Sequence, residues 1–352
     1  MKKTNRKMMI SVIVLALLCS SSCGTRVDSE TEKDINITTS NSTVISEVPP
    51  HIEETVVKNN VHISIKADVE ASDKELMQVK LTHDENNLNR LYNDWIKPKY
   101  PNAKKQADES YDYGWGISQS DGDVSMSFTA SKTGAISFID VAKNINGTSD
   151  EDEHIFESGY ITNDIPKGMN IKAKEAEAEA VKLITPYTPF EYKANNIRVI
   201  NDIKRNTGFY DINMQAFLNG VPICVVVGGD RDFYNLCFEA RVSKEGIFSF
   251  QGSTNLKVID NKKAVISTKF EDFMDYYLKD ISVLAAGKDI EVRRIYQAYL
   301  PEISYADDPY ITLTPVWCFE TVDSRNEDGQ LITLKYTIAY SVETGKLMGK
   351  FF

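Results

Sequence analysis

The sequence has few of the residues that most often carry catalysis. Its 352 residues include four histidines and five cysteines. It lacks the Gly-x-Ser-x-Gly turn of serine hydrolases, and it lacks the His-Glu-x-x-His and Cys-x-x-Cys spacings of common zinc sites. The glycine pair Gly228-Gly229 follows a predicted strand but leads into another strand rather than a helix, so no phosphate-binding loop is predicted. We therefore predict no catalytic residue, no metal and no cofactor.

Long hydrophobic runs are also scarce, and the main one lies at the N-terminus. Met8 to Leu18 gives about eleven apolar residues, fewer than the roughly twenty needed to span a bilayer. Residues 1–22 instead resemble a bacterial lipoprotein signal peptide, which predicts lipidation of Cys23 by palmitate-type acyl chains and anchoring at the outer face of the cell membrane. Ordinary secretory cleavage after Ser22 is the alternative, because Ser20 stands where such signals prefer leucine. The cationic start of the signal comprises Lys2, Lys3, Arg6 and Lys7.

Basic residues are outnumbered by acidic ones. The formal net charge is −11, and removal of residues 1–22 takes away four cations and no acids, which leaves −15. Such a charge repels polyanions, so nucleic acid and anionic lipid headgroups are not predicted as partners. The acidic clusters lack the spacing of a calcium-binding loop and indicate solvated turns. These clusters are Asp121–Asp123, Asp150–His154 and Asp230–Asp232.

Cysteine is too scarce for a disulfide framework. If Cys23 carries lipid, the mature chain retains only Cys224, Cys237 and Cys318, which is an odd number. Two interpretations stay open. Either Cys224 and Cys237 pair across neighbouring strands, or all three are buried thiols.

Aromatic residues are absent from the segment that follows the signal. Residues 23–60 are rich in Ser, Thr, Glu and Asn and contain Pro49-Pro50, so they cannot bury enough apolar surface to fold alone. We predict a disordered, lipidated tether. Coil scaling gives it a span of about 30 Å.

Beyond the tether, helices alternate with β-hairpins. Amphipathic helices are predicted over Leu88–Ile96, ended by Pro98, over Ala173–Ile184, and from a Thr268/Glu271 capping box to Gly287. Each helix precedes a hairpin whose turn glycine is expected at positive φ. The three glycines are Gly134, Gly246 and Gly345.

The fold class predicted from this pattern is α+β, with two or three repeated helix-plus-antiparallel-sheet modules. The module boundaries are placed at 61–165, 166–255 and 256–352, with the alternative that the last two modules form one domain. Further strands are expected where β-branched or aromatic residues alternate. They are 61–69, 76–82, 113–119, 196–204, 210–218, 223–227, 290–300, 311–319 and 332–340.

Two groups of aromatic residues are candidates for ligand binding. Tyr111, Tyr113 and Trp115 alternate along one strand, so their rings lie on one side of it, where they either stack on a sugar or peptide or pack under a helix. Trp317 lies in a strand that begins at Pro315 and is expected near a sheet edge.

The C-terminal third resembles a known group of proteins. Tyr299-Leu300-Pro301, then Leu313 to Glu320, then Ile338 to Lys346 give a Pro-Val-Trp strand followed by a Thr-Gly turn. This ending is similar to those of uncharacterised Gram-positive (Firmicutes-type) lipoproteins, of extracytoplasmic regulators of the cell-wall sensor kinase, and of peptidase-propeptide-like domains. The resemblance implies a non-catalytic module that contacts another envelope protein. The kinase regulators carry a transmembrane helix where this chain carries a lipid signal.

The sequence thus predicts a lipid-anchored extracytoplasmic binding protein, not an enzyme, whose partner is another envelope protein or a peptide. The alternative is an envelope hydrolase that cleaves glycan with a carboxylate pair, since the spacing of such a pair is spatial and not readable from sequence. Solute capture for a transporter is a weaker third option.

Overall fold

The computed structural model describes residues 48–107, 114–121, 124–131, 134–140, 152–154, 164–202, 207–226, 234–266, 268–285, 289–304, 309–327 and 330–351. All of these belong to one compact unit, Ser40–Phe352. The lipidation candidate Cys23 and most of the predicted tether lie outside the described residues. Within the described ranges, no helix combines the length and apolar character needed to cross a membrane.

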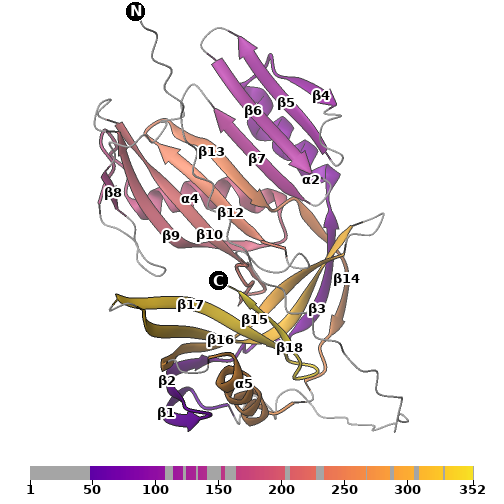
Figure 1. Ribbon diagram of the computed structural model, residues 1–352. Helices are drawn as coiled ribbons and strands as arrows, with labels where there is room; N and C mark the ends of the chain where they lie inside the picture. Colours follow the sequence, from indigo (N-terminus) through magenta and orange to yellow (C-terminus); the bar gives the residue numbers. More distant parts are fainter. Residues whose placement is uncertain are drawn as a thin grey trace, which may run out of the picture. The chain divides into compact units, whose positions relative to one another are not determined.

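The first of the two sheets has eight strands and combines the two ends of the described chain (Figure 1). Its main path runs β1-β2-β15-β16-β17-β18, and β3 joins it by pairing with both β16 and β14. The pairs are antiparallel except for β2 with β15, which run parallel. The strands are β1 (His51–Lys58), β2 (Val61–Glu70), β3 (Met77–His83), β14 (Leu256–Lys263), β15 (Asp289–Ser304), β16 (Tyr310–Glu327), β17 (Gln330–Ser341) and β18 (Leu347–Phe351).

Helix α5 (Phe270–Leu284) covers one face of this sheet. Its apolar stripe packs on the central strands: the Tyr277 ring stacks on Phe319 at a centroid distance of 4.5 Å. The hydroxyl group of Tyr340 in β17 donates a hydrogen bond to Asp280 of the helix at 3.0 Å, and the hydroxyl groups of Tyr277 and Thr321 are hydrogen-bonded at 3.0 Å. The helix therefore contributes both apolar contacts and partners for the buried tyrosine hydroxyls.

The second sheet has ten strands, which follow one another in the sequence between residues 104 and 253. Its main path is β4-β5-β6-β7-β13-β12-β10-β9-β8, and β11 pairs with β10. The strands are β4 (Lys104–Ala107), β5 (Gly114–Asp121), β6 (Val124–Ser131), β7 (Ala135–Asp140), β8 (Asp152–His154), β9 (Glu191–Asp202), β10 (Thr207–Leu218), β11 (Val221–Pro222), β12 (Cys237–Ser243) and β13 (Gly246–Ser253).

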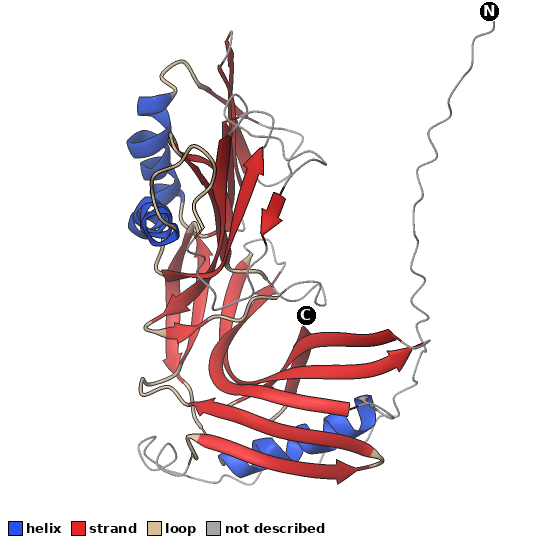
Figure 2. Cartoon of the chain, turned by 90° about the vertical axis from the view of Figure 1, so that its left-hand side faces the viewer, coloured by secondary structure: helices blue, strands red, loops and turns tan. Residues whose placement is uncertain are grey.

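Helices lie on one face of the ten-stranded sheet (Figure 2). Helix α4 (Ala173–Ile184) buries its alanine-rich stripe, including Ala176 and Ala180, against the sheet, because small side chains allow a close approach. The short segments α2 (Glu85–Leu91), the π-helix η1 (Tyr92–Ile96) and α3 (Lys97–Lys99) follow one another, and the 3₁₀ turn η2 (Thr185–Tyr187) extends α4. Trp95 of η1 packs edge-on against Phe138 and Phe250.

Several local predictions are confirmed. The three turn glycines have φ of +89°, +92° and +67° at Gly134, Gly246 and Gly345. The second helix has the predicted bounds. The third begins one residue later than predicted, because Lys269 N–H donates to Asp272 where a Thr268/Glu271 box was expected. Pro98 lies within α3 and does not end the helical segment.

The predicted tether is too long at its C-terminal end. His51–Lys58 forms strand β1, which pairs with β2 along its whole length. The strand is mostly exposed, so it shows no apolar alternation, and the turn that joins it to β2 is made by Asn59 and Asn60 at φ of +50° and +62°. This Asn-Asn pair is a hairpin signal that the composition of the segment obscures.

The predicted modules do not each form a sheet of their own. Residues 61–165 contribute β2 and β3 to the eight-stranded sheet and the five strands β4 to β8 to the ten-stranded one. Strand β7 pairs with β13, so the first two predicted hairpins lie in a single sheet. The observed architecture is mostly strand, with two antiparallel-rich sheets and few helices.

Candidate functional site

The ten-stranded sheet has one face that no described helix covers (Figure 2). On β10 the residues Tyr210, Ile212 and Met214 are buried in the main core beneath the helices. Because side chains alternate along a strand, Asp211 and Asn213 point to the opposite face. Antiparallel pairing aligns them with polar residues of the neighbouring strands.

The register builds two polar rows that each cross six strands, β9, β10, β12, β13, β7 and β6. We call these two rows the polar face. Except for Asp211, its residues are half-buried or exposed. The first row contains Arg198, Asp211, Arg241, Ser249, Ile139 and Ser127, and the second contains Asn196, Asn213, Glu239, Gln251, Ser137 and Thr129.

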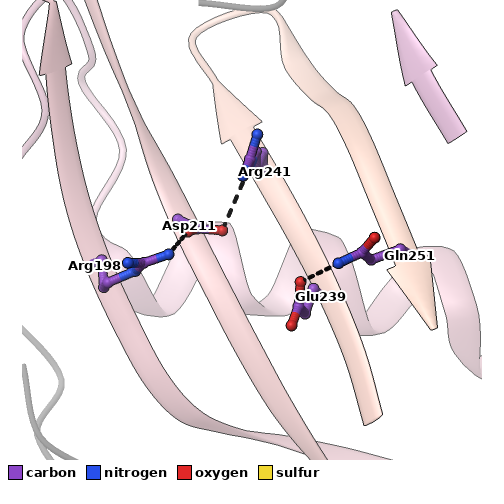
Figure 3. A network of polar contacts seen from close by, with 5 residues as sticks. All are labelled: Arg198, Asp211, Glu239, Arg241 and Gln251. Atoms are coloured by element: carbon purple, nitrogen blue, oxygen red, sulfur yellow. Dashed lines mark hydrogen bonds and ion pairs between the residues drawn. The ribbon is translucent and has the colours of Figure 1, made fainter. Parts of the chain in front are cut away.

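Asp211 is the centre of an ion-pair network on this face (Figure 3). One carboxylate oxygen accepts a hydrogen bond from Arg198, and the other lies 3.6 Å from Nε of Arg241. The Asp211 side chain is 7% exposed, whereas those of Arg198 and Arg241 are 30% and 43% exposed. A buried carboxylate is stable only when it is paired, so the two guanidinium groups are fixed beside it and still reach the surface.

Next to this network, Glu239 accepts a hydrogen bond from the Gln251 amide at 2.5 Å (Figure 3). Asn196 Oδ1 is buried and accepts no hydrogen bond from the described residues. The charged members of the polar face are two arginines and two carboxylates, which makes the face neutral in a strongly acidic chain.

An apolar cluster borders the network on the same face. Ile200, Phe209 and Phe248 are buried together, and the Phe209 and Phe248 rings meet edge-to-face at 5.3 Å. The Arg241 guanidinium lies 5.8 Å from the centroid of the Phe209 ring. The Phe209 ring of this cluster therefore forms a cation–π contact with the guanidinium group.

Cys237 belongs to the same side of β12, opposite Gln215. Burial, together with the neighbouring Glu239 carboxylate, raises the pKa of its thiol to about 11. At neutral pH the group is therefore a thiol and a poor nucleophile.

A cavity of about 280 Å³ lies on the helix side of this sheet. Tyr187 donates a hydrogen bond to Asp94 at 3.4 Å, and the Lys99 ammonium lies 3.8 Å from the centroid of the Trp95 ring. Burial, together with the Asp94 carboxylate, raises the pKa of Tyr187. The volume is just below the usual range for small-molecule sites. The lining residues are Asp94, Trp95, Lys99, Glu179, Lys182, Leu183, Pro186, Tyr187 and Ile247.

Of the aromatic residues proposed from sequence, Trp317 is buried in the core of the eight-stranded sheet. Its side chain is 2% exposed and packs against Phe270 of α5 at a centroid distance of 5.0 Å. The expected edge position is also wrong, because β16 pairs with β15, β17 and β3, and Pro315 lies opposite Tyr299 inside the sheet. Pro315 has no N–H to donate, but its carbonyl accepts a hydrogen bond from the Val342 N–H at 3.0 Å.

The other predicted aromatics lie in a less completely described region. Tyr111 and Tyr113 fall outside the described residues. The backbone of Trp115 belongs to β5 and lies opposite Ala130 of β6. Of the two candidates whose backbone is described, Trp115 lies in the ten-stranded sheet and Trp317 in the eight-stranded sheet.

The described carboxylates bear on both the metal-site and the glycan-hydrolase interpretations. Among the described residues, no group of three or more His, Cys, Asp or Glu side chains is arranged to hold a metal ion. Asp211 and Glu239 come from adjacent strands, but Asp211 is engaged by two arginines and Glu239 by Gln251. A glycosidase needs one carboxylic acid free to protonate the leaving group and a second carboxylate free to act on the sugar or a water.

Of the two interpretations of the cysteines, the Cys224–Cys237 pair does not match the structure. The Cys224 sulfur lies 3.4 Å from that of Cys318, and no disulfide bond joins the three cysteines in the structure.

Sequence reasoning missed Arg198, Asp211 and Arg241. The strands that carry these residues were predicted. The sequence also shows that each strand has a charged residue at a position that points away from the core. Which charges meet depends on register, and the bulge in β9 between the partners of Asn213 and Met214 shifts the alternation.

Comparison with known proteins gives a fold but no family. No family model matches the chain, and no curated protein matches it. A crystal structure of an uncharacterised protein from Eubacterium rectale is similar, with a TM-score of 0.58 and 13% sequence identity, over 86% of this chain and 94% of that one. At this identity the likeness concerns the fold alone.

Proposed function

We propose that this chain is a non-catalytic binding protein of the bacterial cell envelope, held at the outer face of the membrane by lipid on Cys23, and that the polar face of the ten-stranded sheet contacts its partner. The observation that carries the proposal is the Arg198–Asp211–Arg241 network. It holds two arginines in place on a face that no described helix covers, and arginines held in this way lose little conformational entropy on binding.

The shape and chemistry of the polar face favour a protein partner. The cavity on the helix side of the ten-stranded sheet is lined by other residues. A hydrogen-bonding surface that crosses six strands suits a macromolecule better than a small solute, which needs a concave site. The polar face holds no aromatic side chain on which a sugar ring would stack. Its neutrality removes the repulsion that the acidic chain would otherwise exert on an acidic partner.

The experiment that tests this proposal is affinity capture from crosslinked, detergent-solubilised membranes of the producing bacterium. The wild-type chain is compared with Ser137→Arg/Asn213→Arg, which places two bulky side chains on the polar face and keeps the Asp211 network. The matched control is His62→Arg/Ser64→Arg, at exposed positions of β2 in the other sheet.

We expect a stoichiometric envelope protein with the wild type and the control, and its loss with the polar-face variant. Equal capture by all three variants would contradict the assignment of the face, and no captured protein would favour a glycan or small ligand. In the same cells, Cys23→Ala is expected to move the protein from the membrane to the soluble fraction. Membrane retention of that variant would contradict the anchor.

We also propose that the recurring helix-and-hairpin pattern reflects repetition of a smaller unit. The support is that α4 precedes the β12–β13 hairpin and α5 precedes the β17–β18 hairpin, and that both turns contain a glycine at positive φ. Superposition of residues 173–253 on residues 270–351 tests the idea. A common path of helix and hairpin is expected, and unrelated paths would contradict it.

A further inference from the structure

Two cysteines from distant parts of the chain meet between the two sheets. Cys224 follows the short strand β11, and Cys318 lies in the middle of β16. Their sulfur atoms are 3.4 Å apart, although the residues are 94 positions apart in sequence. The Cys224 and Cys318 side chains are 3% and 0% exposed.

The backbone on both sides holds the two sulfurs in place. Ile223 forms a parallel bridge with Tyr299 of β15, and the Cys224 N–H donates to the Tyr299 carbonyl at 2.8 Å. Cys318 is paired in register with Tyr296 of β15 and with Ala339 of β17. An apolar cluster encloses the pair. It consists of Val226, Tyr296, Ala298, Leu300, Val316, Ala339 and Phe351, with Met348 packed against it.

We propose that Cys224 and Cys318 form a disulfide bond in the mature protein. A disulfide has a sulfur–sulfur distance of about 2.05 Å, so bond formation requires the two sulfurs to approach by about 1.4 Å from their separation of 3.4 Å. The bond would tie the segment after β11 to the centre of the eight-stranded sheet. The proposal goes beyond the binding function, and it uses the proposed extracytoplasmic location only as the source of an oxidant.

The oxidant is a disulfide compound, either the disulfide of a thiol oxidoreductase or a small-molecule disulfide. One cysteine thiolate attacks this disulfide, forms a mixed disulfide and releases one thiol. The second cysteine thiolate then attacks the protein sulfur of the mixed disulfide, forms the Cys224–Cys318 bond and releases the second thiol. Two electrons pass to the oxidant, whose disulfide is reduced to two thiols, and the two protons lost by the cysteines end on them.

The exchange takes place before the apolar cluster closes. In the folded chain both sulfurs are enclosed, and burial raises the pKa of Cys318 well above that of a free thiol. The thiolate needed for attack is therefore scarce once folding is complete, and an oxidoreductase has no access to either sulfur.

Cys237 provides an internal control. It is half-buried on β12, and its register partner there is Gln215. We expect it to remain a thiol under conditions that oxidise the other two.

The experiment maps thiols in the full chain isolated from native membranes after acid quenching, denaturation without reductant and alkylation. A second sample is refolded in a buffer of reduced and oxidised glutathione. We expect alkylation of Cys237 alone and a crosslinked peptide containing Cys224 and Cys318 in both samples. In Cys224→Ser, alkylation of Cys318 is expected to appear.

Alkylation of both Cys224 and Cys318 in both wild-type samples would overturn the proposal, and so would a crosslink from either residue to Cys237. A crosslink only in the refolded sample would support the pairing and contradict the extracytoplasmic location. Failure of the membrane-capture experiment has no bearing on the crosslink, so the two proposals fail independently.

Discussion

At the scale of single residues, the polar face depends on one buried carboxylate. Asp211 is the common partner of Arg198 and Arg241, so its charge decides whether both guanidinium groups keep their positions. An amide of the same size retains the shape of the side chain but not its charge.

Asp211→Asn is expected to lower the free energy of unfolding by about 1–3 kcal/mol, because two arginines lose a charged partner in a largely buried site. Urea unfolding measures this change. The matched substitution Glu239→Gln affects a pair on the exposed part of the same face and is expected to cost no more than about 0.5 kcal/mol. Equal losses for the two variants would show that burial of Asp211 is not the deciding factor.

A buried tyrosine makes stability sensitive to alkaline pH. The Tyr210 hydroxyl donates to the carbonyls of Asp164 and Ile171, and burial, helped by the Asp164 and Glu175 carboxylates, raises its pKa to about 12. A tyrosine in the unfolded chain titrates near pH 10. Between about pH 10 and 12 the unfolded chain has released this proton while the folded chain retains it, so stability falls as pH rises.

Tyr210→Phe is expected to reduce the loss of stability between pH 10 and 12, although the variant is less stable at pH 7 because two hydrogen bonds are lost. Chemical unfolding at a series of pH values tests this. Parallel stability curves for the wild type and the variant over pH 10–12 would contradict the role of Tyr210.

At the scale of elements, the tight turns are where sequence predicted structure best. Gly134 and Gly220 both adopt positive φ, at +89° and +80°, but their surroundings differ. A Cβ atom added at Gly134 would lie 2.6 Å from Leu256 Cδ2, whereas one added at Gly220 would meet nothing within 4 Å.

For both Gly→Ala variants, the left-handed backbone is therefore expected to lower the free energy of unfolding by about 1–2 kcal/mol. Gly134→Ala is expected to lose about 1–3 kcal/mol more, because Leu256 must move in a packed core. Thermal unfolding of the two variants separates the contributions. Similar losses at the two positions would indicate that Leu256 moves without cost.

What could be predicted at this scale depended on how local the signal was. The helical spacing of apolar residues predicted α4, and the turn glycines predicted the hairpins, because both signals come from residues close in sequence. The parallel pairing of β2 with β15 could not be predicted, since it joins segments more than 200 residues apart. The polar face was missed for the same reason. No local sequence pattern marks its charged residues, and only the strand register brings together Arg198, Asp211 and Arg241. Trp317 was predicted to be accessible because the sequence of an aromatic strand does not show whether a helix covers it.

At the scale of the whole molecule, the Cys224–Cys318 bond would close a loop of 94 residues between the two sheets. Loop-closure entropy gives such a crosslink an upper stabilisation of about 4–5 kcal/mol. A reductant is therefore expected to lower the unfolding midpoint of the wild type. It is expected to leave Cys224→Ala/Cys318→Ala unchanged, and a shift of the double variant would point to another reducible group.

The order of strands also bears on how the chain folds as it is made. The ten-stranded sheet is continuous in sequence, but the eight-stranded sheet needs β1 to β3 from before it and β14 to β18 from after it. A chain that emerges N-terminus first, from a ribosome or an export channel, can complete the ten-stranded sheet while the eight-stranded sheet still lacks most of its strands. Strand β2 then lacks its parallel neighbour until residue 296 has emerged. Newly made chains thus pass through a stage in which β2 is an open edge, and this is the stage at which a chaperone would be needed most.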